Sequence, residues 1–246
     1  MTEREIKALV SLLDDPDVEV LQHVESKILS LGEVVIPFLE NKWEESLDPD
    51  LQRKIEEMLH QLQFENLKIK LINWKKDGGR NLLEGMWLVA LFQYPDLKLE
   101  FLKAEINQIY FESWLAFRSE LHPFDQIKVL NSIFFGNFRF KANTRNFHAP
   151  ANSMINMVLE SRRGNPISLA VIYMLIARKL EMPIYGINLP NIFVLTYKTK
   201  EFQFYINPFN RGLIFTREDI DNYLKQISVN PSPTFYEPCS HLQIVK

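Results

Sequence analysis

The residues most capable of chemistry surround the start of an apolar helix. The stretch "SRRGNPISLA" covers residues 161–170 and leads directly into "LAVIYMLIARKL". Ser168 is the nucleophile type nearest to this start. Arg162 and Arg163 could hold a carboxylate or phosphate through paired N–H donors, or either could pair with Glu160 and fix the turn. The pattern therefore leaves open catalysis, anion binding or a structural role.

A catalytic serine needs a base within about 3 Å. The histidines are His23, His60, His122, His148 and His241. His148 lies in the loop before Asn152 and could fold over the helix start, so Ser168 with His148 is one possible catalytic pair. The simpler interpretation is that Ser168 satisfies backbone groups in the first helical turn.

The single cysteine offers a second pair. Cys239 and His241 are two residues apart, which would put both side chains on one face of an extended segment. A reactive thiol needs positive, partly exposed surroundings, and the proline-rich tail gives no sign of them. The simpler interpretation is an incidental cysteine. No residues show metal-ligand spacing, and the aromatic residues lie at helical spacing typical of a core, so we expect neither a metal nor a cofactor.

Composition narrows the possible partners and the compartment. The net charge of −3 gives no basic field for nucleic acid or an anionic membrane. One cysteine permits no internal disulfide, which fits a reducing compartment. The N-terminus is charged and lacks a signal-peptide pattern, and no run approaches the roughly 20 apolar residues of a membrane span. We expect a cytoplasmic protein whose partner is a protein or peptide.

The elements that must position these residues are mostly helical. Residues 1–64 read as short amphipathic helices, with a capping box from Thr2 to Glu5. The spacing of "LG…VIPFL" resembles a HEAT-type repeat, although a plain helical bundle explains it nearly as well. We place the boundary of this helical arm near residue 65.

The rest of the chain predicts an α+β domain over residues 65–228. The segment 135–153 is turn-rich and reads as a loop, and a buried central helix follows over 168–180. The period then changes from 3.6 to 2, and "PIYGINL", "IFVLTY" and "FQFYIN" predict three antiparallel strands. Thr216 with Asp219 caps a last helix. The tail, 229–246, is expected to be extended.

Three motifs in this order resemble a known family. They are "YPDLKLEFLKAEI" at 94–106, the long block at 152–195, and "INPFNRG" at 206–212. Together they are similar to transglutaminase-like proteins of the SirB type. The resemblance covers more than half of the chain and implies a core like that of the transglutaminase and papain group, with a central helix packed on an antiparallel sheet.

The resemblance also implies where catalytic residues would stand. Active members of the superfamily place a cysteine at the start of the central helix, a histidine on the next strand and an aspartate on the following strand. In this sequence those positions hold Pro166, Ile192 and Asn207. Proline and isoleucine supply neither nucleophile nor base, and a neutral amide cannot stabilise an imidazolium.

The sequence therefore favours a catalytically inactive transglutaminase-like protein that acts in binding, regulation or scaffolding. A hydrolase or acyltransferase with relocated residues, Ser168 with His148 or Cys239 with His241, is the alternative. If the fold is right, the degenerate cleft gathers several polar side chains. The binding candidates are Arg162, Arg163, Asn165, Ser168, Asn191, Asn207 and Asn210.

Overall fold

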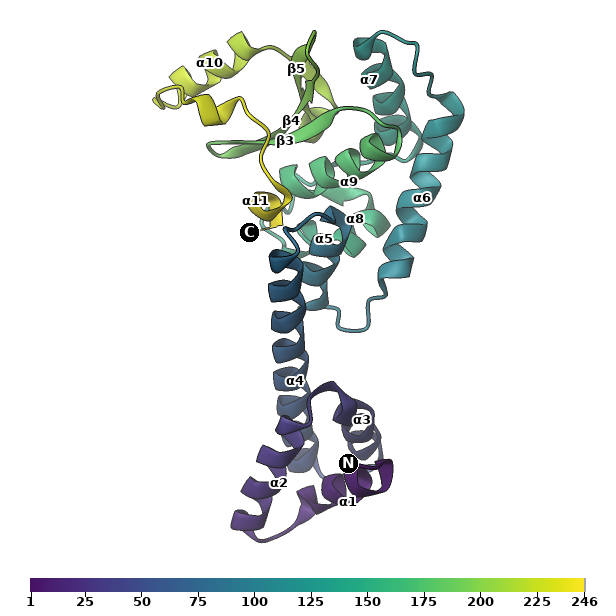
Figure 1. Ribbon diagram of the computed structural model, residues 1–246, viewed down its shortest axis with the longest axis vertical. Helices are drawn as coiled ribbons and strands as arrows, with labels where there is room; N and C mark the ends of the chain where they lie inside the picture. The colour runs from purple at the N-terminus through teal and green to yellow at the C-terminus, as the bar shows by residue number, and fades with distance from the viewer. Residues whose placement is uncertain (246) are drawn as a thin grey trace. The chain divides into compact units, whose positions relative to one another are not determined.

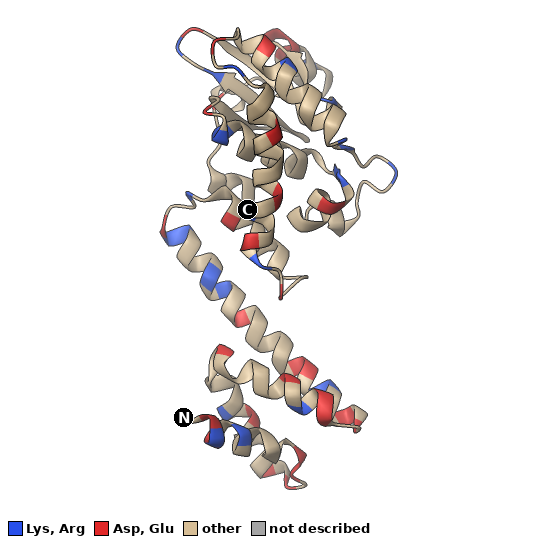
Figure 2. Cartoon of the chain, turned by 90° about the vertical axis from the view of Figure 1, so that its right-hand side faces the viewer, with Lys and Arg blue, Asp and Glu red and all other residues tan. Residues whose placement is uncertain are grey.

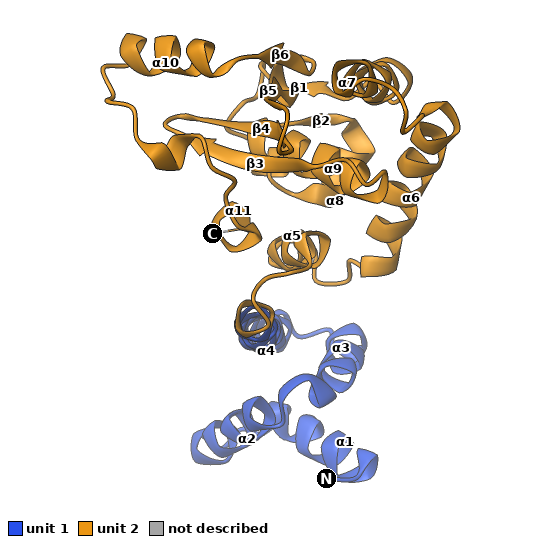
Figure 3. Cartoon of the chain, turned by 45° about the horizontal axis from the view of Figure 1, so that its top comes forward, with its two compact units in different colours: residues 1–73 blue, residues 74–246 orange. Residues whose placement is uncertain are grey.

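The computed structural model describes residues 1–245 and divides into two compact units, Met1–Asn73 and Trp74–Lys246 (Figure 3). The expected boundary near residue 65 falls inside α4, a continuous helix over Pro49–Lys76. Its sequence carries no glycine, and Gly78-Gly79 ends it with two positive φ angles. The division therefore lies at the last turns of this helix.

The first unit is entirely helical in its regular structure. Its helices before α4 are α1 (Glu3–Ser11), α2 (Val18–Ser30) and α3 (Ile36–Glu45). The predicted capping box is present, because Thr2 and Glu5 exchange hydrogen bonds at the start of α1. The unit has a hydrophobic core of its own, in which Ile28, Leu39 and Ile55 are fully buried.

The second unit is built around α9 (Pro166–Lys179) (Figure 1). Nine residues of α9 are buried, so the helix is apolar nearly all round, as expected for a helix covered on several sides. Burial of each large apolar side chain contributes roughly 1.5–3 kcal/mol. The helix packs on α5 (Leu82–Leu91), α6 (Leu99–Ala116) and α8 (Ile155–Ser161) and on one face of a sheet.

That sheet has four antiparallel strands in the order β3-β4-β5-β6. The strands are β3 (Ile184–Leu189), β4 (Ile192–Lys198), β5 (Gln203–Asn207) and β6 (Leu213–Phe215). The first three match the predicted strands, and β6 was not predicted. The α+β, mostly helical class is thus observed. A further small sheet pairs β1 (Lys141–Ala142) with β2 (Arg163–Gly164) in parallel.

The described part of the second unit contains three further α-helices. They are α7 (Pro123–Asn131), α10 (Arg217–Gln226) and α11 (His241–Val245). Thr216 and Asp219 form the predicted capping box of α10. The tail expected to be extended instead contains a 3-10 turn at Pro233–Phe235 and the helix α11. It docks because Tyr236 and Ile244 are buried and the Cys239 N–H donates to the Gly186 carbonyl at 2.9 Å.

Charge is spread rather than concentrated. Figure 2 shows basic and acidic positions interspersed along both units, in keeping with the small net charge. Within residues 1–245, no helix is both long and apolar enough to cross a bilayer.

The close packing around Gly164 predicts that a larger residue at this position destabilises the second unit. A Cβ at Gly164 would lie 2.4 Å from the Ser168 Oγ and 2.9 Å from a Val158 methyl. Gly164→Ala should therefore lower the free energy of unfolding by about 1–3 kcal/mol, measured by urea denaturation. Gly136→Ala is the matched control, because its Cβ would meet nothing closer than 4.0 Å, and it should be neutral or slightly stabilising. Equal effects of the two changes would contradict this packing.

Candidate functional site

The start of α9 is closed by a reciprocal cap. Asn165 is the N-cap residue, and its Oδ1 accepts the Ser168 N–H at 2.8 Å. The Ser168 Oγ in turn accepts the Asn165 N–H at 3.0 Å. Pro166 follows at the first helical position, where its missing N–H costs nothing. Ser168 is 1% exposed, so its hydroxyl is turned into the protein and engaged with the cap.

Arg162 is held by contacts within the fold, while one of its terminal nitrogens is buried without a hydrogen-bond partner among the described residues. It ends α8 with a left-handed φ of 57°, and one guanidinium nitrogen lies 3.1 Å from a Glu105 carboxylate oxygen on α6. The guanidinium also lies over the rings of Phe138 and Phe140, at 5.6 and 5.1 Å from their centroids. It therefore ties α6 and α8 to the segment 138–140, which directly precedes β1. Arg163 is exposed and forms no ion pair with any described residue.

A cleft of about 440 Å³ opens beside the α9 start. Three segments line it: the loop residues 147–150 with Ser153, the helix start 165–167, and the β3–β4 turn residues 188, 189 and 191–193. Pro166 and Ile192, at which the resemblance would place a nucleophile and a base, both line this cleft. The predicted binding residues Asn165 and Asn191 also line it. None of the described lining residues carries an acidic or basic side chain other than His148.

The loop that carries His148 is held by Asn152, which is 3% exposed. The Asn152 Nδ2 donates to the carbonyl oxygens of Asn146 and Phe147 at 2.7 and 2.8 Å, and its Oδ1 accepts from Asn143 at 2.8 Å. These bonds fold the loop beside the helix start. His148 therefore lies in the cleft, as its position before Asn152 suggested, while Ser168 is not among the residues that line it.

Asn191 forms the corner of the β3–β4 turn. Its φ is 61°, the left-handed region that asparagine tolerates better than most residues. Asn191 follows Pro190, and proline is favoured at the turn position before a residue with positive φ. Asn207 and Asn210 do not line the cleft. The Asn207 Oδ1 accepts the Asn210 N–H at 3.1 Å, so the two shape the turn after β5.

Sequence reasoning missed the other lining residues, among them Phe147, Ser153, Ile167 and Asn188. The Ser153 hydroxyl accepts a hydrogen bond from the Asn165 Nδ2 at 2.9 Å, which joins the loop to the helix cap. The signal was available, because Ser153 belongs to the same long motif that contains Asn165.

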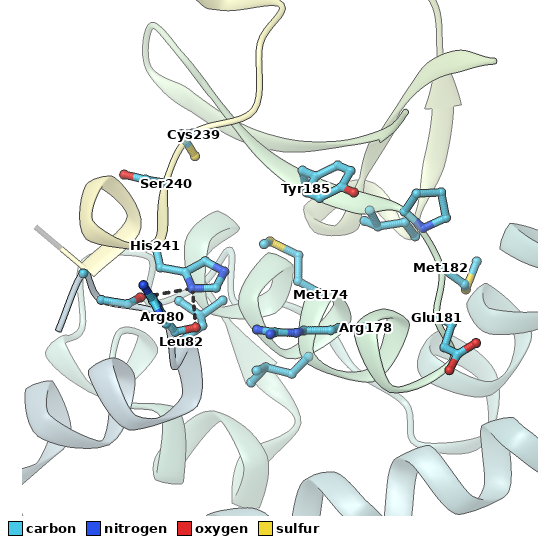
Figure 4. Close-up of a pocket in the computed structure, with 15 residues that line it drawn as sticks. Arg80, Leu82, Met174, Arg178, Glu181, Met182, Tyr185, Cys239, Ser240 and His241 are labelled. Carbon is cyan, nitrogen blue, oxygen red and sulfur yellow. Dashed lines mark hydrogen bonds between the residues drawn. The ribbon is translucent and has the colours of Figure 1, made fainter. Parts of the chain in front are cut away.

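Cys239 and His241 line a different cavity. His241 begins α11, so the strand geometry that would have paired them does not apply. A Cβ on Gly186 would lie 3.1 Å from the Cys239 Sγ, so the thiol packs against β3. Burial raises the pKa of Cys239, which disfavours the thiolate. Figure 4 shows the thiol and the imidazole on separate parts of the wall.

The fold and the cleft together define a class: a helix-centred α+β core with a cleft at the helix start. The family model described as "Transglutaminase-like superfamily" matches residues 100–246. The chain belongs to this superfamily. No solved structure matches it.

Curated relatives cover parts of the chain. A UPF0162 protein of Xylella fastidiosa is 29% identical over 177 residues, which is 62% of this chain and 59% of that protein. UPF0162 protein YchA of Escherichia coli K12 is 29% identical over 48% of this chain and 45% of its own length. Human F-box only protein 21 is 31% identical over 29% of this chain and 11% of its own length. The chain thus matches less than two thirds of each relative.

The raised pKa of Cys239 predicts slow alkylation. Because the thiolate is the nucleophile, the rate of reaction with iodoacetamide should rise with pH around a midpoint above that of a free thiol. Intact-mass measurement on the folded chain gives this rate without ambiguity, since the sequence has one cysteine. The same chain in urea is the control and should show an ordinary thiol midpoint. A folded-state rate that has already levelled off at pH 7 would contradict the burial of this thiol.

Proposed function

We propose that this chain is a SirB-type, catalytically inactive member of its superfamily whose cleft binds a peptide segment of a partner protein in the cytoplasm. The observation that carries the proposal is the pair Pro166 and Ile192 in the cleft wall. Neither side chain can donate, accept or transfer a proton. Asn207, at the third position, bonds within its own turn.

The cleft offers chemistry suited to a peptide backbone. The side-chain amides of Asn188 and Asn191 are exposed, and neither has a hydrogen-bond partner among the described residues. Each amide can donate and accept, as a peptide group does. Ile167 and Phe147 flank these amides with 39% and 43% of their surface exposed, which supplies apolar contact for peptide side chains.

The first unit enters the proposal as a HEAT-like docking arm over residues 1–64. It is supported by the separate hydrophobic core of that unit and by the "LG…VIPFL" spacing. A second surface on the same chain would increase the effective concentration of a partner already bound at one of the two.

Peptides selected from a random library on the full chain test the cleft. Ile167→Arg places a charge at the α9 start and should weaken the binding of the selected peptides by about tenfold or more. Leu213→Arg is the matched control, since Leu213 is 53% exposed on β6 and lies outside the cleft. Affinities measured by fluorescence polarisation should be unchanged in this control. Peptides that bind Ile167→Arg as tightly as the parent would place recognition elsewhere.

One observation favours the second candidate, a hydrolase or acyltransferase: His148 lies in the cleft. Against it, Ser168 is buried and bonded to the helix cap. We expect no covalent labelling of the native chain by a fluorophosphonate, read by intact mass. Labelling that disappears in both Ser168→Ala and His148→Ala would establish the hydrolase instead.

A further inference from the structure

A second and larger cavity lies toward the other end of α9. Its volume is about 690 Å³, within the range of small-molecule sites. Its walls come from the segment after α4, the last turns of α9, the start of β3 and the tail at Cys239, Ser240 and His241. All of these residues belong to the second unit. None of them belongs to the cleft described above.

Two arginines reach this cavity without an internal partner. Arg80 and Arg178 line it, and no hydrogen bond or ion pair engages either guanidinium within residues 1–245. Arg162, by contrast, is held by Glu105 and two aromatic rings. Figure 4 shows Arg178 extending toward Arg80 and His241, while Glu181 lies at the opposite end. The arginine end of the cavity therefore carries excess positive charge.

His241 adds a directed ring nitrogen at the same end. Its Nδ1 lies 3.2 Å from the Gly79 carbonyl oxygen and 3.0 Å from that of Arg80. Carbonyl oxygens only accept, so Nδ1 carries the proton. The two carbonyls thus fix the ring orientation and leave Nε2 as the free nitrogen. It can accept a hydrogen bond from an acid or hydroxyl group of a ligand.

Much of the remaining wall of the cavity is apolar. Leu82, Met174 and Met182 are buried beneath it, and the Tyr185 ring, 43% exposed, stands on β3 above them (Figure 4). Methionine side chains adapt to ligands of varied shape. A cation pair beside an apolar floor matches a molecule with an oxyanion at one end and a hydrocarbon or aromatic body.

We propose that this cavity is a binding site for a small organic anion, a carboxylate or phosphate ester on an apolar body. The oxyanion lies between the guanidinium groups of Arg80 and Arg178, and the body lies over Leu82 and Met174. No covalent step is involved. The site is independent of the peptide cleft, so Ile167→Arg leaves it unchanged.

Four probes test this on the full chain by calorimetry: 3-phenylpropionate, phenyl phosphate, inorganic phosphate and neutral 3-phenylpropan-1-ol. The two amphiphilic anions should bind most tightly, and they should slow alkylation of Cys239, whose thiol lines the cavity. Whichever of the two binds more tightly identifies the preferred oxyanion, and either order supports the site. Weaker binding of inorganic phosphate supports the role of the apolar floor.

Arg178→Gln and Arg80→Gln should each weaken the binding of the anions by about tenfold or more. The melting temperature should not change, because both residues are exposed. Arg118→Gln is the matched control, an exposed arginine of the same unit outside the cavity. The proposal is overturned if the neutral alcohol binds as tightly as the anions. It is also overturned if both arginine variants bind like the parent, or if no anion binds or protects Cys239 at about 10 mM, a concentration far above that of a useful ligand.

Discussion

The hydrogen bonds between Asn165 and Ser168 are the local constraint on which the cleft depends. They satisfy two backbone N–H groups at a partly buried helix end. They also fix the direction in which the chain enters α9. The Asn165 amide extends the same network to Ser153, and the neighbouring Asn152 holds the loop of His148. The shape of the cleft follows from these amides.

Under the proposed function, this network explains why the core would lack the chemistry of active superfamily members. A helix start can stabilise a thiolate or an oxyanion only if its N–H groups are available to the reacting atoms. Here Asn165 occupies the Ser168 N–H, and Pro166 has no N–H to offer. In that proposal, the start of α9 serves to join the helix to the preceding loop. The side-chain amides of Asn188 and Asn191, which have no hydrogen-bond partner among the described residues, line the cleft on its β3–β4 side.

Features fixed by neighbouring residues could be predicted from the sequence. The capping boxes at Thr2 and Thr216 each need only a partner three residues ahead, and both are present. The alternating pattern of β5 likewise predicts its strand. Strand β6 escaped prediction because three residues between a turn and a cap show no period.

Features that depend on the path of an irregular loop or on the folding back of the chain could not be predicted. Asn152 is buried because three loop groups surround it, and nothing in its own surroundings in the sequence indicates them. The tail folds back because Gly186 leaves room for the Cys239 thiol and because the Gly79 carbonyl accepts from His241.

The docking of the tail has a consequence for the order of synthesis. Residues 239–241 supply one wall of the larger cavity, while Arg80 and Leu82 supply another. The ribosome adds Arg80 and Leu82 long before it reaches residues 239–241. The helical floor, with Arg178, is therefore available to fold while the chain is still growing, but the cavity is complete only after residue 241 has left the exit tunnel. Proteolytic clipping ahead of Cys239 would return the mature chain to that open, nascent form.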